Sequence, residues 1–146
     1  MKKGSIIFAG VFTLICMLAV VALSIFAMPI ADWYVDWRNI DPLLKTVIPV
    51  AFWICAVPAL AALGCLLVLL RNILKEHIFE EINSRMMSII CRCCVAVAAV
   101  TAICTYWYMP FSFVAAAMVF LCLIVSVVRG CFKAAITLRE ENDLTI

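Results

Sequence analysis

Charged side chains are absent from three long stretches of this sequence, residues 4–31, 46–70 and 93–128. The chain has 146 residues, of which 68% are hydrophobic, whereas a typical soluble domain is about 45–50% apolar. About 20 consecutive apolar residues suffice for a helix that crosses the hydrocarbon core of a bilayer, and lipid forces the backbone to satisfy its hydrogen bonds internally. The missing charge therefore excludes an ordinary water-soluble domain and predicts membrane-spanning helices.

Residues that carry catalysis or bind metals are also scarce. His77 is the single histidine, and no carboxylate lies within the three apolar stretches. The sequence therefore offers neither a serine–histidine–acid set nor a proton relay inside the membrane. We expect no enzyme activity, no cofactor and no metal site. The net charge of +2 is small and evenly spread, so direct binding of nucleic acid is not expected either.

Cysteine is plentiful, but none of the nine lies in segment 29–45, between the first two apolar stretches. An external disulfide framework is therefore not expected. Cys91, Cys93 and Cys94 form a dense group around Arg92. A basic neighbour favours thiolate, and with it reactivity or metal binding, whereas small apolar fillers are the simpler interpretation. The role of these three cysteines stays open.

The third apolar stretch is too long for one span and predicts a helical hairpin. Its 36 residues would form a helix of about 54 Å, far longer than the hydrocarbon core is thick. Its middle carries aromatic side chains and a proline, in the order Tyr106-Trp107-Tyr108-Met109-Pro110-Phe111. Aromatic rings collect at the membrane interface, and proline disfavours helical geometry in the preceding residue. We therefore expect the chain to turn near Met109-Pro110.

The predicted fold is an all-α membrane protein, a single domain (1–146) that forms a bundle of four transmembrane helices. The expected spans are about 5–28, 46–70, 87–109 and 111–132, with a connector at 71–86 and a tail at 133–146. A secretory signal is the alternative for the first span, but its apolar run exceeds the roughly 7–15 residues of a signal core. We expect an uncleaved helix. Pro58 should bend the second span, because it cannot donate to the carbonyl of Ile54.

The distribution of basic residues predicts that both termini are cytoplasmic. Four spans place both chain ends on one side, together with nine Lys and Arg residues, and leave two on the other side. A bias of nine to two indicates that the richer side faces the cytoplasm. The expected location is the bacterial plasma membrane, as a multi-pass protein. The nine are Lys2, Lys3, Arg71, Lys75, Arg85, Arg92, Arg129, Lys133 and Arg139, and the two are Arg38 and Lys45.

The loops admit two interpretations each. In segment 29–45, a spacing of four places Asp32 with Asp36, and Trp33 with Trp37, on one helical face. This fits either a short connector lying in the interface or an acidic, aromatic surface that binds an extracellular peptide. In segment 71–86, a partial helical period predicts that span two continues as an amphipathic helix. That helix ends at a break or cap near Asn83-Ser84, and it could dock a partner or lie on the headgroups.

Two arginines border the third apolar stretch and are expected at similar depth on neighbouring helices. Arg92 precedes Pro110 by 18 residues and Arg129 follows it by 19, which is about 27–28 Å of helix in each case. Both are candidate intramembrane ion-pair residues that reach the headgroups. The candidate counter-charges are Glu76, Glu80, Glu81, Glu140 and Glu141.

Two segments resemble a known family. They are ILKEHIFEEINSRMMSIICRC at 73–93 and VVRGCFKAAITLREENDLTI at 127–146. The closing Glu-Asn-Asp-Leu-Thr-Ile string is the most specific element, and Phe79 and Asn83 match a phenylalanine and an asparagine of the family's second connector. The chain is similar in these segments to the bacterial membrane family called domain of unknown function 2975, although Glu76-His77-Ile78 replaces the family's small residues before the phenylalanine.

The resemblance implies a four-span membrane protein without an established activity. Genes of this family often neighbour a small helix-turn-helix transcription regulator, which implies a membrane protein that holds or releases such a regulator in the cytoplasm. The candidate partner contacts are Lys75, Glu80, Arg85, Arg139, Glu140 and Glu141. The alternatives are an immunity or stress protein against membrane-active peptides, and a small transporter or channel subunit, which would require an oligomer.

Overall fold

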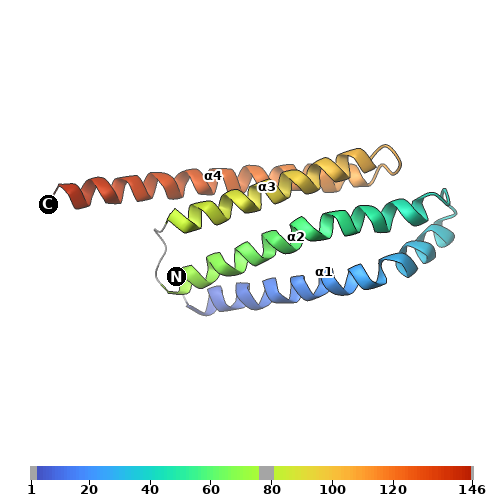
Figure 1. Cartoon of the computed structure of the whole chain (residues 1–146), viewed down its shortest axis with the longest axis horizontal. Helices are drawn as coiled ribbons and strands as arrows, with labels where there is room; N and C mark the ends of the chain where they lie inside the picture. Colours follow the sequence, from blue (N-terminus) through green and yellow to red (C-terminus); the bar gives the residue numbers. More distant parts are fainter. Residues whose placement is uncertain (1–2, 76–80, 146) are drawn as a thin grey trace.

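The computed structural model describes residues 3–75 and 81–145 and contains four long α-helices (Figure 1). They are α1 (Lys3–Arg38), α2 (Leu44–Leu74), α3 (Glu81–Cys104) and α4 (Phe111–Leu144). No strand occurs within the described residues. Each helix is long and apolar enough to cross a membrane. The predicted all-α bundle of four transmembrane helices is therefore confirmed, and the chain is a multi-pass membrane protein.

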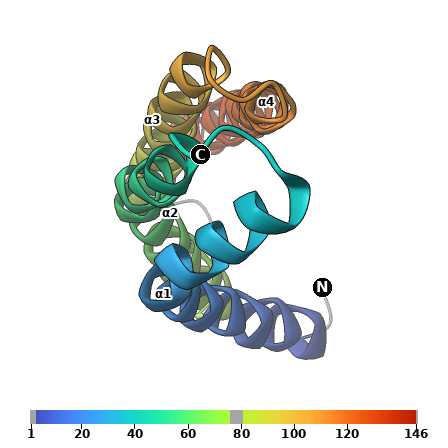
Figure 2. The same cartoon turned by 90° about the vertical axis from the view of Figure 1, so that its right-hand side faces the viewer.

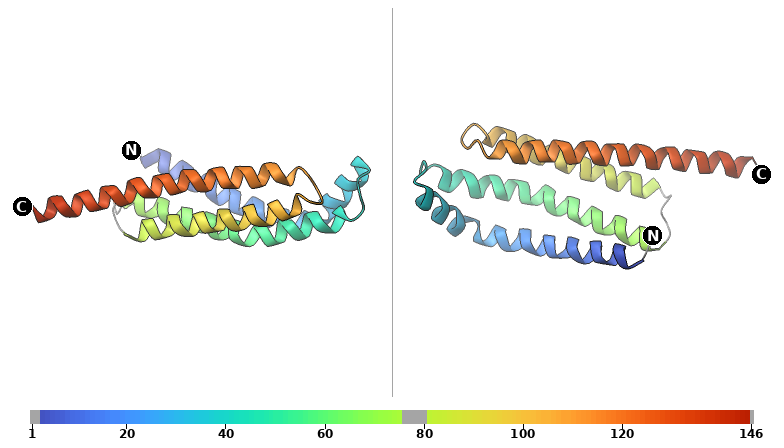
Figure 3. Two further views of the ribbon diagram at one scale, coloured as in Figure 1. Left: turned by 90° about the horizontal axis from the view of Figure 1, so that it is seen from above. Right: turned by 180° about the vertical axis from the view of Figure 1, so that it is seen from behind.

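The four helices form an open arc in which each packs on its neighbour in the sequence. α1 packs on α2, α2 on α3 and α3 on α4, while α1 and α4 do not pack along each other in the described chain. Seen along the bundle, α1 and α4 lie at the two ends of the arc (Figure 2). We call the end that holds both termini the termini end and the end that holds the α1–α2 and α3–α4 turns the hairpin end (Figure 3).

Small side chains allow these helices to approach closely. Ala27 and Ala31 of α1, Ala51 and Ala56 of α2, and Ala98 of α3 are all buried. In lipid, apolar surface gives little drive for helices to associate, so close packing between small residues contributes much of the attraction. A side chain also reaches across one of these interfaces, because Trp53 Nε1 of α2 donates to the backbone oxygen of Ser24 in α1 over 2.9 Å.

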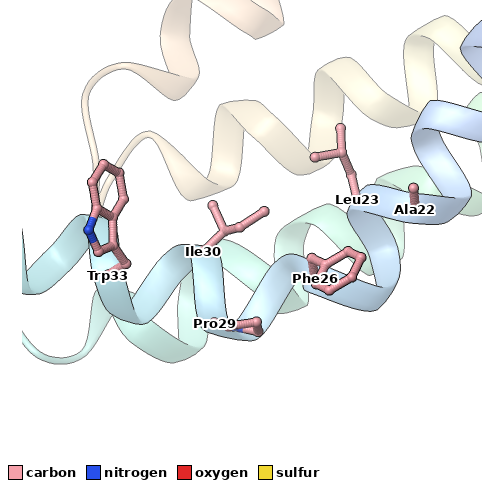
Figure 4. A pocket seen from close by; sticks show the side chains of 6 residues that line it. All are labelled: Ala22, Leu23, Phe26, Pro29, Ile30 and Trp33. Atoms are coloured by element: carbon pink, nitrogen blue, oxygen red, sulfur yellow. The ribbon is translucent and has the colours of Figure 1, made fainter.

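α1 is longer than the predicted first span and bends where Pro29 lies (Figures 1 and 4). The proline removes one backbone hydrogen bond, to Ile25, and kinks the helix without ending it. α1 ends instead at Arg38, and the next residue, Asn39, has a φ of +50°. The backbone N–H groups of Asn39 and Ile40 bond to Asp36 and Val35, the Schellman pattern of a helix end. Most of segment 29–45 is thus a continuation of α1 and not a separate connector.

The second connection is also shorter than expected. α2 continues through Pro49 and Pro58 to Leu74, and α3 already begins at Glu81. The predicted break or cap at Asn83-Ser84 is wrong, because both residues lie inside α3 and are buried. The Asn83 side chain accepts a hydrogen bond from Asn72, so its polar group is satisfied within the helix interface.

The α3–α4 hairpin turns where the sequence predicts it. Residues 105–110 connect the two helices, and Pro110 is the residue before the first turn of α4. α4 then runs for 34 residues, against 24 for α3, a difference of about 15 Å at 1.5 Å per residue. The last turns of α4 consequently project beyond the rest of the bundle at the termini end (Figure 1).

Candidate functional site

The sequence-predicted partner contacts within the described residues lie at the termini end, just after α2, on α3 and on α4. Lys75 follows the last residue of α2, Arg85 lies in the second turn of α3, and the remaining contacts lie on the projecting part of α4. All of those within the described residues are exposed. Glu80 lies outside the described residues. The exposed set is Lys75, Arg85, Arg139, Glu140 and Glu141.

The structure brings two of these contacts together in a polar cavity of about 450 Å³ between α3 and α4. Arg85 and Glu140 line this cavity, and so does Arg129, which the sequence predicted for an ion pair inside the membrane. We call it the polar cavity. Lys75 and Glu141 are not among its lining residues. The lining side chains are Glu81, Ser84, Arg85 and Ser88 of α3 and Arg129, Lys133, Ile136, Thr137 and Glu140 of α4.

Arg129 and Arg92 differ in their surroundings. Arg92 is exposed, whereas Arg129 is half-buried. The Arg129 Nε atom is fully enclosed, and none of the described residues provides it with a hydrogen-bond partner. Glu81 and Glu140, two of the predicted counter-charges, line the same cavity, while Glu76 and Glu80 lie outside the described residues. An enclosed donor without an acceptor costs free energy, so the position of Arg129 Nε is unfavourable in the structure.

Near the polar cavity, a pair of asparagines joins α2 to α3. Asn72 Nδ2 donates to Asn83 Oδ1 over 2.9 Å, and Asn83 is 0% exposed. Sequence reasoning treated Asn83 as a helix break, because asparagine disfavours helix interiors. An asparagine at the start of an apolar helix, with a second asparagine 11 positions earlier, is the signal that could have indicated this contact.

At the hairpin end, two tyrosines connect α1 to the α3–α4 turn. The phenol oxygens of Tyr34 and Tyr108 lie 2.5 Å apart, and their rings meet edge to face with centroids 6.4 Å apart. The Arg38 guanidinium lies close to both hydroxyl groups. Phe111 extends the cluster through a second edge-to-face contact with Tyr108 at 5.9 Å. Sequence reasoning missed this contact because the two tyrosines are 74 positions apart.

The acidic and aromatic residues of segment 29–45 share helical faces, in agreement with their spacing. The rings of Trp33 and Trp37 are stacked, with centroids 5.9 Å apart. Asp36 forms an ion pair of 2.7 Å with Lys45 of α2, which compensates part of the acidic charge. Within the described residues, no group of three or more His, Cys, Asp or Glu side chains could hold a metal ion.

The three cysteines around Arg92 lie in two different environments. Cys91 faces α4, where its Sγ lies 3.4 Å from Ser126 Oγ. Cys93 and Cys94 line an apolar cavity of about 320 Å³ that also touches Val20 of α1 and Met118 of α4. The structure describes all nine cysteines of the chain, and each is a free thiol.

Apolar hollows also follow the inner side of α1. One, of about 440 Å³, lies at the bend and is lined by α1 residues alone (Figure 4). Two of its lining residues, Ile30 and Trp33, also line a second hollow of about 280 Å³ that reaches Tyr34 and Tyr108. The apolar surface is thus continuous from the bend to the hairpin end. The first hollow is lined by Ala22, Leu23, Phe26, Pro29, Ile30 and Trp33.

Comparison with known proteins gives one relationship. No curated protein matches the chain, and no solved structure matches it. A family model described as "Protein of unknown function (DUF2975)" matches residues 32–146. The match contains the end of α1 and all of α2, α3 and α4, including the asparagine pair and the polar cavity. Because it covers most of the chain, this membrane protein belongs to the DUF2975 family.

Proposed function

We propose that the protein is a membrane-bound regulatory partner that docks a small cytoplasmic helix-turn-helix transcription regulator at the termini end. The projecting part of α4 carries this proposal. It continues the helix past the packed bundle to Leu144, and none of the described residues of α4 is buried. The exposed side chains of this helix end are accessible to a protein outside the membrane.

The side chains of this projection suit a protein partner. Leu138 is 63% exposed and is followed by Arg139, Glu140 and Glu141. An apolar anchor surrounded by charges of both signs is the usual composition of a helix that lies in the groove of another protein. Lys75 and Arg85 add basic groups at the same end of the bundle. The neighbouring regulator genes implied by the family resemblance indicate the class of partner.

Co-purification tests the proposal. The full chain is extracted in mild detergent from cells that also produce the regulator encoded beside it, and the recovered regulator is quantified. The test variant combines Leu138→Asp with Glu141→Lys. We expect its recovery of the regulator to fall about tenfold, the effect of losing about 1.4 kcal/mol of binding free energy.

The matched control makes the same two kinds of change at the hairpin end, Leu43→Asp with Asp32→Lys, at two exposed positions. This control should recover the regulator as well as the unmodified chain does. Recovery no greater than that given by an unrelated membrane protein would contradict the proposal, and so would equal recovery by both variants.

The two alternative functions have weaker support. Binding of cationic peptides would require acidic charge in segment 29–45, and the ion pair of Asp36 with Lys45 neutralises part of that charge. A pathway for an ion or solute would need polar groups between the helices, whereas the cavity touched by all four helices is lined by aliphatic, aromatic and sulfur-containing side chains. The projecting helix therefore remains the feature on which the proposed function rests.

A further inference from the structure

We propose that the polar cavity binds the headgroup of a zwitterionic phospholipid, phosphatidylethanolamine. In this arrangement Arg129 and Lys133 hold the phosphate, and Glu81 and Glu140 hold the ammonium group. The site shares Arg85 and Glu140 with the candidate partner contacts. The docking test changes Leu138 and Glu141, which do not line the cavity, so the two proposals can fail separately.

The deeper part of the cavity has the donors that a phosphate requires. Arg129 presents an enclosed Nε–H without an acceptor among the described residues, and Lys133 lies one helical turn further along α4. Ser84 and Ser88 contribute hydroxyl groups from the facing side of α3. Guanidinium groups bind phosphate through paired, charge-assisted hydrogen bonds. Because protein atoms enclose Arg129 Nε, a phosphate in the cavity would be held by the other nitrogens of the guanidinium and by Lys133.

The position of Arg129 along α4 corresponds to the depth of lipid headgroups. It follows Pro110, at the hairpin end, by 19 residues, which is about 28 Å of helix and close to the full thickness of the hydrocarbon core. On the side of Arg129 toward the membrane centre, residues 111–128 of α4 carry no charged side chain, so acyl chains of the same lipid would meet an uncharged helix surface there.

The order of charges along the cavity favours ethanolamine as the headgroup. Glu81 is the first residue of α3, and Glu140 follows Arg129 by 11 residues, which is about 16 Å further from the membrane centre. On α4 the cations Arg129 and Lys133 therefore lie deeper and the Glu140 carboxylate lies further out, and phosphatidylethanolamine has its phosphate and its ammonium in that same order. Arg85 lies 4.0 Å from Glu81, so Glu140 is the carboxylate to which an uncharged glycerol headgroup would bring no cation.

Lipid titration of the purified full-length chain tests this assignment. The chain is held in a neutral detergent, and its thermal unfolding is followed while short-chain phosphatidylethanolamine, short-chain phosphatidylglycerol or inorganic phosphate is added. We expect phosphatidylethanolamine to raise the unfolding temperature most. Arg129→Gln should weaken the apparent affinity about tenfold, a loss of about 1.4 kcal/mol. The combined Glu81→Gln and Glu140→Gln variant should lower the effect of phosphatidylethanolamine to that of phosphatidylglycerol.

Arg92→Gln is the matched control, because Arg92 is expected at the same depth but does not line the cavity. It should respond to lipid as the unmodified chain does. If Arg129→Gln fails to fold, Lys133→Gln is the second variant and should show the same weakening. Three results would overturn the assignment: equal shifts with inorganic phosphate alone, equal shifts with both lipids, or equal losses in Arg92→Gln and the cavity variants.

Discussion

The hydroxyl groups of Tyr34 and Tyr108 share a hydrogen bond of 2.5 Å that connects α1 to the turn between α3 and α4. The helices on either side of this contact do not otherwise pack on each other in the described residues. The contact therefore closes the hairpin end of an arc that is open along the rest of its length. Its removal should affect the position of α1 more than the packing of α3 on α4.

Tyr34→Phe should lower the stability of the protein in detergent. The substitution keeps the edge-to-face ring contact and removes one hydrogen bond, leaving the Tyr108 hydroxyl without that partner. Thermal unfolding of the purified variant measures the effect. Tyr106→Phe is the matched control, because Tyr106 is 88% exposed and should leave the unfolding temperature unchanged. Equal unfolding temperatures for all three proteins would show that the tyrosine contact does not hold the arc.

Asn72→Ala should destabilise the α2–α3 interface by about 1–3 kcal/mol, because it takes one hydrogen-bond partner from a fully buried amide. Reversible unfolding in mixed detergents gives the free energy. Asn142→Ala is the control, since Asn142 is exposed near the end of α4. A loss no larger for Asn72→Ala than for the control would contradict the role assigned to the asparagine pair.

Val35→Ala should also cost about 1–3 kcal/mol, because Val35 is among the largest fully buried side chains of the described chain and its truncation leaves a cavity. The same measurement applies. At Val57, which is 72% exposed, the identical substitution should cost much less. Comparable losses at the two positions would mean that α1 is not packed beyond Pro29 as described.

Reporter fusions test the predicted orientation. A reporter that is active only in the cytoplasm should be active when it is fused at either terminus, because nine of eleven Lys and Arg residues are assigned to that side. The same reporter inserted at Asp41, in the α1–α2 turn, should be inactive. Activity at one terminus alone would contradict the even number of spans, and activity at Asp41 alone would reverse the orientation.

The number of helices and the α3–α4 hairpin could be predicted because both depend on local properties. Long uncharged stretches require helices in lipid, and Pro110 beside three aromatic residues marks a turn. The extent of α1 could not be predicted in this way. The expected first span ends at residue 28, but α1 continues through Pro29, because a proline removes only part of the backbone bonding when the residues on both sides remain compatible with a helix.

The contacts between distant residues required the structure. Asn83 resembled a helix break because its intrinsic helix propensity is low, and its burial depends on Asn72 lying on the facing helix. Tyr34 and Tyr108 meet only because α1 continues past its bend. For the polar cavity, helix spacing predicted that Arg129 would lie at headgroup depth, while the enclosure of its Nε atom depends on how α3 packs on α4.

The arrangement in which each helix packs on its neighbour in sequence has a consequence for biosynthesis. Contacts between adjacent helices have short loops to close, so their entropic cost is small and they can form early. Each newly inserted helix can dock on the one made immediately before it while the ribosome is still elongating the chain. The tyrosine bond at the hairpin end must wait until the α3–α4 turn has emerged, so it joins α1 to a residue that is made 74 positions later.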